Sequence, residues 1–417
     1  RSPDDSLSST ISVKSQDLST HFISLLWDTH QHFTNITNAA FSSHPDMLRA
    51  RDQAFSSIIN ASRQSSEFYA NILAKYSLNI MRVSKYETDE PSQSDDTFYL
   101  HQVDRLLLFF KLLDNADYFL TLYRIYFAKR LILKNFIPER EELFIDRLKT
   151  HLSSNSAQLF KLKRMFEDVY ASESFTESFR RDEDRMEVEE GGVQPVALLQ
   201  KTTSPRPLLS ASILTFSAWP YLDSQPLYTP HASIASYHKQ LESFYLHQHV
   251  GRKLSWVHKL EKGTLRCNGF EKAYEMIVNS FQASILLQFN QYSQIRLGDL
   301  FQTLSLSEDE FLANLNSLVH FKIVRPSHSN DTRFESVASH ANTEFCVNTH
   351  FKSRHLKLPL YLHTSLRRLS NAEIEKAQQQ VDMDRDYTIQ SVIVRVMKAE
   401  RRLSTQHLLQ RIIQEMQ

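Results

Sequence analysis

The chain holds 18 histidines, side chains that can bind a metal or move a proton. Two close pairs, His30 with His32 and His247 with His249, are each separated by two positions. On a helix that spacing turns the two rings about 200° apart, away from a shared ion. The sequence has no HExxH motif, and its two cysteines are too few for a four-thiolate zinc site. It therefore predicts no metal site.

Motifs for covalent catalysis and for phosphate binding are also missing. Serine, histidine and aspartate all occur, but no local motif arranges them as a nucleophile and its base. The chain has 6 glycines, whereas an average usage of about 7% would give roughly 29. Phosphate-binding loops and the nucleophile elbow of hydrolases require clustered glycines. The sequence thus predicts neither a catalytic residue nor a cofactor.

One lysine near the carboxyl end is placed where its amine could react. Residues 384–413 have a helical pattern with one apolar stripe. The stripe consists of Ile389, Val392, Ile393 and Val396. At about 100° per residue, Lys398 lies about 180° from Ile389. We therefore expect the Lys398 side chain to face away from the core.

The same segment is locally basic in a neutral chain. The chain has 48 basic and 48 acidic residues, but residues 391–411 contain five basic side chains and one acidic side chain. The basic residues are Arg395, Lys398, Arg401, Arg402 and Arg411. Because such a run can contact phosphates, a winged-helix DNA-binding regulator is one functional hypothesis.

The first half of the chain is predicted to be a stack of helices. Residues 103–132 have apolar positions three and four apart with no proline or glycine, which predicts one helix or a tightly linked pair. Other helices are predicted at His21–Ser43, Met47–Ala61, Ser66–Arg82, Glu139–Ser153 and Ala157–Val169. Two polar, acidic stretches, residues 87–97 and 180–207, are predicted to be loops or linkers.

The second half is predicted to mix strands and helices. Residues 212–219 (SILTFSAW) alternate and end before a proline, which is typical of an edge strand. A helix is expected at 234–249, followed at 252–265 by a hairpin that turns at Gly263. Residues 273–326 contain three helical patterns and then a strand pattern, which is the order of a winged helix.

No part of the sequence predicts a membrane partner. No uninterrupted apolar run reaches the roughly 18 to 20 residues of a membrane span. No secretory signal opens the sequence, and the neutral overall charge does not favour nucleic acid. We therefore expect a protein of the cytoplasm and nucleus.

Six segments of the sequence together match the motifs of one known protein family. One is IVRVMK at 393–398, with Asp384 and Arg385 before it. The others are YFAKRLI at 126–132, KLKRMFEDV at 161–169, SAWP at 217–220, FYLHQHVGRKLSW at 244–256 and SFQASILLQFN at 280–290. In type and order these segments resemble motifs of the cullins, the scaffold subunits of cullin-RING ubiquitin ligases, and IVRVMK resembles the signature near the cullin carboxyl end.

This resemblance implies a mainly helical chain with a smaller α/β region. Residues 1–98 resemble the end of the third cullin repeat, and residues 99–211 resemble helices of the four-helix bundle with an acidic insert. Residues 212–360 resemble the α/β region with a first winged helix. Residues 361–417 resemble a linker helix and a second winged helix, which we expect to be truncated, leaving residues 407–416 without a cover.

The resemblance also implies a function, which is positioning rather than catalysis. A small RING-H2 protein is expected to insert a strand beside residues 212–219 and to recruit a ubiquitin-conjugating enzyme. The residues expected to receive that strand are Ile213, Leu214, Thr215, Phe216 and Trp219. Lys398 is expected to receive a ubiquitin-like modifier through an isopeptide bond (neddylation). A substrate adaptor is expected to bind repeats that precede this sequence.

The sequence departs from the family pattern at two places, and one related family remains an alternative. The acidic stretch from Asp182 to Glu190, with the tail to Pro207, is longer than the usual connection. Glu400 stands where a basic or neutral residue is commoner. A cullin-like subunit of the anaphase-promoting complex is the alternative scaffold, but that family lacks the modified-lysine motif, which is intact here.

Overall fold

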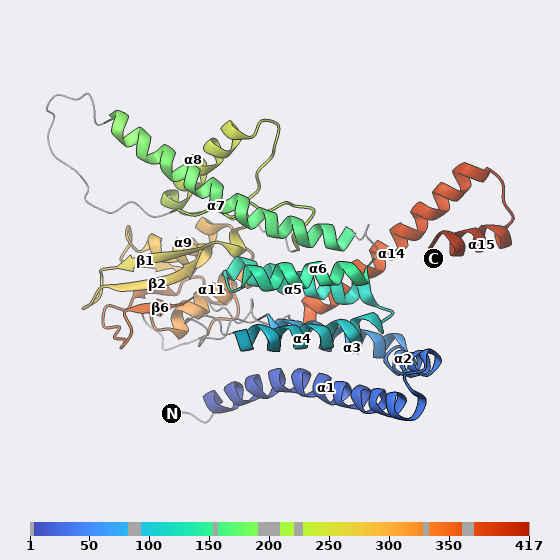
Figure 1. Cartoon of the computed structure of the whole chain (residues 1–417). Helices are drawn as coiled ribbons and strands as arrows, with labels where there is room; N and C mark the ends of the chain where they lie inside the picture. Colours follow the sequence, from blue (N-terminus) through green and yellow to red (C-terminus); the bar gives the residue numbers. More distant parts are fainter. Residues whose placement is uncertain are drawn as a thin grey trace. The chain divides into compact units, whose positions relative to one another are not determined.

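The computed structural model describes residues 4–81, 93–152, 157–190, 209–220, 228–327, 333–360 and 371–416. The chain forms two compact units (Figure 1). The first unit contains residues 1–170, 213–220 and 366–417, and the second contains residues 171–212 and 221–365. The architecture is mainly helical with a smaller α/β part, as the sequence predicts.

The regular secondary structure of the first unit is helical throughout its described residues. The helices are α1 (Asp4–Phe41), α2 (Pro45–Ile59), α3 (Arg63–Ile80), α4 (Gln93–Lys111), α5 (Ala116–Leu133), α6 (Pro138–His151), the first part of α7 (Ala157–Glu190), α14 (Asn371–Glu400) and α15 (Thr405–Met416). The stretch predicted as one helix or a linked pair at 103–132 is a pair, α4 and α5. No helix in the described ranges is long and apolar enough to cross a membrane.

Helix α5 is the central element of this unit. Every residue from Tyr118 to Leu131 is buried, and α5 packs against α3 and α14. A helix that is buried on all sides needs apolar residues around its whole circumference, and the sequence of α5 supplies them. Its buried cations, Arg124, Lys129 and Arg130, therefore require partners from neighbouring helices.

Arg130 of α5 and Glu141 of α6 form a buried ion pair. The guanidinium Nε and Nη2 donate to the two carboxylate oxygens over 2.6 and 3.0 Å. The Tyr123 hydroxyl donates to the same carboxylate over 2.9 Å. Burial, together with the nearby Glu141 charge, raises the pKa of Tyr123 well above its ordinary value, so the phenol keeps its proton. Because all three side chains are buried, water and salt screen the pair little.

Two predicted linkers are partly helical in the structure. Helix α7 does not stop near residue 169 but continues to Glu190, and α4 begins at Gln93 within the stretch predicted as a loop. The sequence of α7 beyond residue 170 is rich in Glu and Arg, which favour helix, and contains no glycine before residue 191. The rest of both predicted linkers, residues 87–92 and 191–207, lies outside the described residues.

The second unit contains two three-stranded sheets. In the first sheet, β2 (Tyr274–Asn279) lies between β1 (Lys262–Cys267) and β6 (Lys357–Pro359), antiparallel to β1 and parallel to β6. In the second sheet, β5 (Glu344–Val347) lies between β3 (Gln294–Arg296) and β4 (Val324–Pro326), antiparallel to both. The unit also contains the end of α7, helix α8 (Ala232–Gln248) and the short 3₁₀ helix η1 (His258–Leu260).

The helices and strands around the second sheet follow the order predicted for residues 273–326. Helices α9 (Ser280–Gln288), α10 (Leu297–Leu304) and α11 (Glu308–His320) precede β4, and the short α12 (Val337–His340) precedes β5. Their apolar faces form one core with β2, which includes Phe281, Leu300, Phe311 and Phe345.

Two local predictions in this unit are wrong. The first of the three helices predicted in residues 273–326 starts later than expected, at Ser280. Residues 274–279 form β2 with alternating burial, and Asn279 caps the helix. Gly263 does not turn a hairpin; it lies within β1 opposite Val278. The turn between the two strands occupies residues 268–273. The sequence does not show where the strand ends and the helix begins, because Met276 and Val278 of β2 and Phe281 of α9 are all apolar and buried.

Candidate functional site

Lys398 lies in the last turn of α14, exposed to solvent. On the opposite face of this helix, Val392 and Val396 are buried against Ile412 of α15. Ile389, at the start of the predicted stripe, is 37% exposed, so the apolar contact begins one turn later. Lys398 makes no hydrogen bond or ion pair with another residue of the described ranges. Its amine is therefore accessible from solvent.

The chain reverses direction directly after Lys398. Arg401 adopts a left-handed conformation with a φ of 56°, and its N–H donates to the Met397 carbonyl over 2.9 Å. This geometry ends α14 without a glycine. Helix α15 then folds back and packs against α14 (Figure 1). Lys398 is therefore held at the end of a helix that α15 covers on its other face.

Two ion pairs connect α14 and α15. Arg395 pairs with Glu415 over 2.6 Å, and Arg411 pairs with Glu400 over 3.3 Å. The glutamate that departs from the family pattern thus has a local partner. Because both pairs are solvent-exposed, each contributes only about 0.2–1 kcal/mol to stability. They engage two of the five basic side chains that motivated the DNA-binding hypothesis.

The other face of α15 lacks a cover in the described part of the chain. Ile412 is buried and Leu408 is partly buried against α14, whereas Leu409, Ile413 and Met416 are each more than half exposed. We expected the apolar face of residues 407–416 to be exposed, and these three side chains are.

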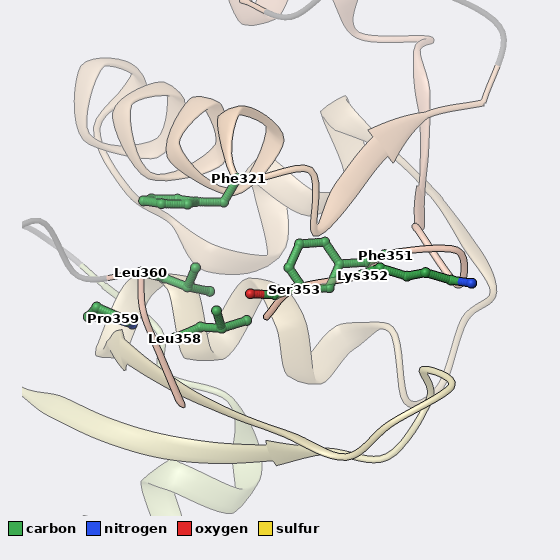
Figure 2. A pocket seen from close by; sticks show the side chains of 7 residues that line it. All are labelled: Phe321, Phe351, Lys352, Ser353, Leu358, Pro359 and Leu360. Carbon is green, nitrogen blue, oxygen red and sulfur yellow. The ribbon is translucent and has the colours of Figure 1, made fainter. Parts of the chain in front are cut away.

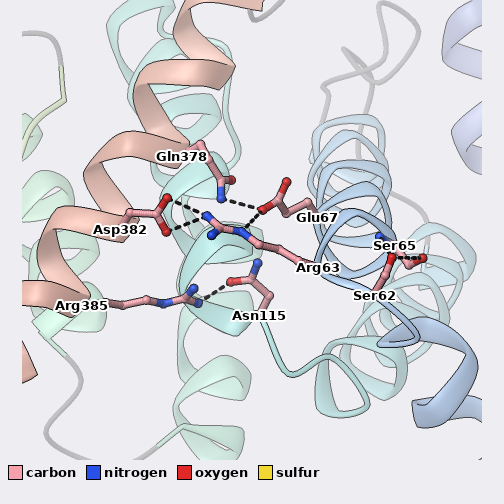
Figure 3. A network of polar contacts seen from close by, with 8 residues as sticks. All are labelled: Ser62, Arg63, Ser65, Glu67, Asn115, Gln378, Asp382 and Arg385. Atoms are coloured by element: carbon pink, nitrogen blue, oxygen red, sulfur yellow. Dashed lines mark hydrogen bonds and ion pairs between the residues drawn. The ribbon is translucent and has the colours of Figure 1, made fainter.

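The first half of α14 is attached to α3 by a polar network (Figure 3). The Arg63 guanidinium of α3 donates through Nη2 to both carboxylate oxygens of Asp382, over 2.8 and 2.6 Å. Its Nε donates to Glu67 over 2.8 Å, and Glu67 also accepts from the Gln378 amide over 2.6 Å. A network of charges that share partners orients a helix better than one isolated surface pair.

Two further contacts attach α14 to α5 and to the turn before it. Arg385 donates to the Asn115 side-chain oxygen over 2.5 Å (Figure 3). Lys129 of α5 pairs with Glu373 over 3.1 Å. Burial lowers the pKa of Lys129, and the Glu373 carboxylate opposes that shift. The buried ammonium therefore gains a counter-charge from α14, which favours this position of the helix.

Residues 212–219, predicted as an edge strand, form no strand in the structure. Residues 209–215 are irregular, and residues 216–220 form a turn in which the N–H groups of Ala218 and Trp219 donate to the Thr215 carbonyl. A strand needs a neighbouring strand for its hydrogen bonds, and the segment packs with the helical unit rather than with either sheet. The alternating sequence alone could not reveal this difference.

The Asp168 carboxylate of α7 holds this segment in place. It accepts hydrogen bonds from the Thr215 N–H over 2.7 Å, the Thr215 hydroxyl over 2.9 Å and the Trp219 indole N–H over 2.8 Å. Arg164 lies 3.2 Å from the same carboxylate. Asp168 and Trp219 are buried, so these charge-assisted bonds act in a medium that screens them weakly.

The predicted strand residues therefore fall into three groups. Trp219 is a buried anchor, Ile213, Leu214 and Thr215 are partly buried, and Phe216 is exposed over 67% of its surface. Phe216 is one of several large hydrophobic side chains that are exposed in the described residues. Sequence alone did not distinguish the anchor from the exposed residue.

The second unit contains a small apolar hollow without reactive groups. It encloses about 290 Å³ and is lined by Phe321, Phe351, Lys352, Ser353, Leu358, Pro359 and Leu360 (Figure 2). The Lys352 ammonium pairs with Glu271 over 2.9 Å, and the Ser353 hydroxyl accepts the His355 N–H. No imidazole or carboxylate lines the hollow, so it offers no base to activate that serine.

A group of possible metal ligands was missed by the sequence analysis. His238, His258 and Glu261 lie together in the second unit. The close histidine pairs considered from the sequence are not part of it, and His30 is instead buried among aromatic rings. Because 20 residues separate His238 from His258, no spacing motif could reveal the cluster.

Comparisons with known proteins identify a common family. Residues 5–176 match the cullin alpha solenoid domain, and residues 213–351 match the cullin alpha+beta domain. The chain is 25% identical to cullin-1 of Dictyostelium discoideum, over 95% of this chain and 49% of that protein. It is 26% identical to cullin-3 of Caenorhabditis elegans, over 97% and 52% respectively. The chain thus spans about half the length of the curated relatives it matches.

Replacing Asp168 with asparagine tests the anchor of residues 213–219. Asp168→Asn removes the charge and one acceptor oxygen, and a hydrogen bond to a charged group contributes about 1.5–3 kcal/mol. We expect the Thr215 amide to exchange with deuterium about tenfold faster or more. The control is Glu177→Gln, at an exposed glutamate of α7 that pairs with Arg181, where we expect no change. Equal exchange rates in the two variants would contradict the assigned anchor.

Proposed function

The chain belongs to the cullin family, and we propose that it is the RING-binding, modifier-accepting part of a scaffold subunit of a cullin-RING ubiquitin ligase. The observation that carries this proposal is the position of Lys398, which is exposed on α14 opposite the buried Val392 and Val396. The proposed role of the chain is to position reactive partners, and Lys398 is the one residue at which it would form a covalent bond.

Attachment of a ubiquitin-like modifier requires an accessible neutral amine. The Lys398 Nζ attacks the carbonyl carbon of a carrier thioester, the carrier thiolate leaves, and the amine loses a proton as the isopeptide bond forms. The exposed amine and the absence of a described ion-pair partner leave room for the carrier enzyme. The apolar contact of Val392 and Val396 with Ile412 of α15 lies on the opposite face of α14 and holds the helix that carries the lysine.

Residues 212–219 are the proposed contact for a RING-H2 protein. Their sequence alternates as a strand does, yet they have no partner strand within the described chain. We infer that a strand of the RING protein pairs with this segment by β-augmentation. The Asp168 contacts fix one end of the segment, and the exposed Phe216 offers an apolar contact.

A scaffold subunit of this kind would speed ubiquitin transfer by being rigid. The RING partner would recruit a ubiquitin-conjugating enzyme, and an adaptor bound to further repeats would hold the substrate. Fixing two reactants in a suitable geometry raises their effective concentration by orders of magnitude. The continuous burial of α5 and its ion pairs with α6 and α14 give the first unit the stiffness that this role requires.

Conservative substitution of Lys398 tests the modification site. Purified chain is incubated with the ubiquitin-like modifier, its activating and conjugating enzymes and ATP, and its intact mass is measured. We expect the wild type to gain the mass of one modifier and Lys398→Arg to gain none, because a guanidinium does not form the isopeptide. Lys376→Arg, at another exposed position on α14, should behave as wild type. A persistent gain in Lys398→Arg would refute the site.

A charged substitution at Phe216 tests the RING contact. We expect a co-expressed RING-H2 protein to be recovered with the wild type and to fall about tenfold or more with Phe216→Asp, the effect typical of a central aromatic contact. Because Phe216 is 67% exposed, the substitution should leave the fold intact. Phe160→Asp, at a side chain of α7 that is 71% exposed, is the matched control. Equal recovery with all three proteins would place the contact elsewhere.

A further inference from the structure

Three potential ligand atoms meet at one point of the second unit. His238 comes from the middle of α8, His258 from η1, and Glu261 from the residue between η1 and β1. The Glu261 Oε1 lies 3.0 Å from His258 Nδ1 and 3.4 Å from His238 Nε2. One ligand atom from each of the three side chains lies within 4.8 Å of the others.

These distances fit the coordination shell of a zinc ion. In a tetrahedral site with metal–ligand bonds of about 2.0–2.1 Å, neighbouring ligand atoms are about 3.3 Å apart. The two distances from Glu261 Oε1 lie on either side of this value. Two imidazoles and one carboxylate are a ligand set that Zn²⁺ takes in proteins, with water in the fourth position.

Neighbouring rings hold the two imidazoles in their positions. The His238 ring stacks on Trp256, with ring centres 4.1 Å apart and planes 20° apart. The Tyr228 ring meets the His258 ring at 4.8 Å in an edge-to-face contact. The side chains of His238, His258 and Glu261 are 16%, 14% and 22% exposed. The cluster is therefore rigid, yet solvent and ions can reach it.

The neighbouring lysine does not occupy the Glu261 carboxylate. The Lys259 ammonium pairs with Glu310 of α11 rather than with Glu261. The Glu261 carboxylate instead faces His238 Nε2 and His258 Nδ1.

We propose that His238, His258 and Glu261 form a binding site for a divalent transition-metal ion of the zinc class. The ion would be bound by His238 Nε2, His258 Nδ1 and Glu261 Oε1, and water would complete the shell. It would tie α8 to the chain segment that enters β1. The site does not depend on the role of Lys398 or of residues 212–219.

Metal titration of the whole chain tests this site. The chain is stripped with a chelator, and Zn²⁺ binding is measured by calorimetry. Co²⁺ is titrated in parallel because its visible absorption reports tetrahedral coordination. We expect one high-affinity Zn²⁺ per chain, tighter than Co²⁺. Zn²⁺ should raise the melting temperature, because a ligand that binds only the folded state stabilises it.

Isosteric and exposed-site variants separate this site from the other histidines. Glu261→Gln keeps the shape of the side chain but removes its charge, and His258→Asn removes one imidazole. Each should weaken Zn²⁺ binding by about 100-fold and abolish the tetrahedral Co²⁺ spectrum. His247→Asn, at an exposed histidine of α8, should bind Zn²⁺ as the wild type does.

Two results would overturn the site. One is the absence of a stoichiometric Zn²⁺ site in the wild type. The other is equal Zn²⁺ affinity in the wild type and in Glu261→Gln, with both proteins showing the same circular dichroism. In either case the three side chains form only a hydrogen-bonded cluster.

Discussion

Adjacent cations on the buried helix α5 hold the helical unit together. Arg130 points to α6, where Glu141 accepts hydrogen bonds from its guanidinium, and Lys129 reaches Glu373 of α14. A buried charge that loses its partner costs several kcal/mol, so each cation strongly favours one placement of the neighbouring helix. The AKRL segment at 128–131, which is part of the family resemblance, thus has a physical role. Its two cations bind the neighbouring helices α6 and α14 to α5.

The position of the proposed modification site depends on how α14 is attached to the rest of the helical unit. Helix α14 starts against α3 and α5, where charged and amide groups attach it. It ends beside α15, where three buried apolar residues form the contact. Polar contacts set the direction of the helix, and the apolar seam near its end keeps Lys398 on the opposite, open face. A lysine at the end of a fixed helix is presented in one orientation, which is what a scaffold requires.

The sequence was sufficient where one helical period or a family motif dominated. The positions of the helices in the first unit, though not all of their ends, the order of elements in residues 273–326 and the exposed face of Lys398 were predicted because local spacing determines them. Residues 212–219 were predicted as a strand, but strand formation depends on a partner strand, and in this chain Asp168 takes the Thr215 N–H instead. The His238–His258–Glu261 cluster arises from tertiary packing and has no local signal. The role of residues 212–219 in binding a RING protein stays a prediction.

Hydrogen exchange of the α5 amides in Glu141→Gln measures how far the buried pair of Arg130 and Glu141 stabilises the helical unit. Removing one charge of a buried pair costs about 3–5 kcal/mol, so the opening free energy of α5 should fall by about 3 kcal/mol. Glu142→Gln, at the adjacent exposed position, should change it by less than about 0.5 kcal/mol. An equally small change in Glu141→Gln would contradict the account.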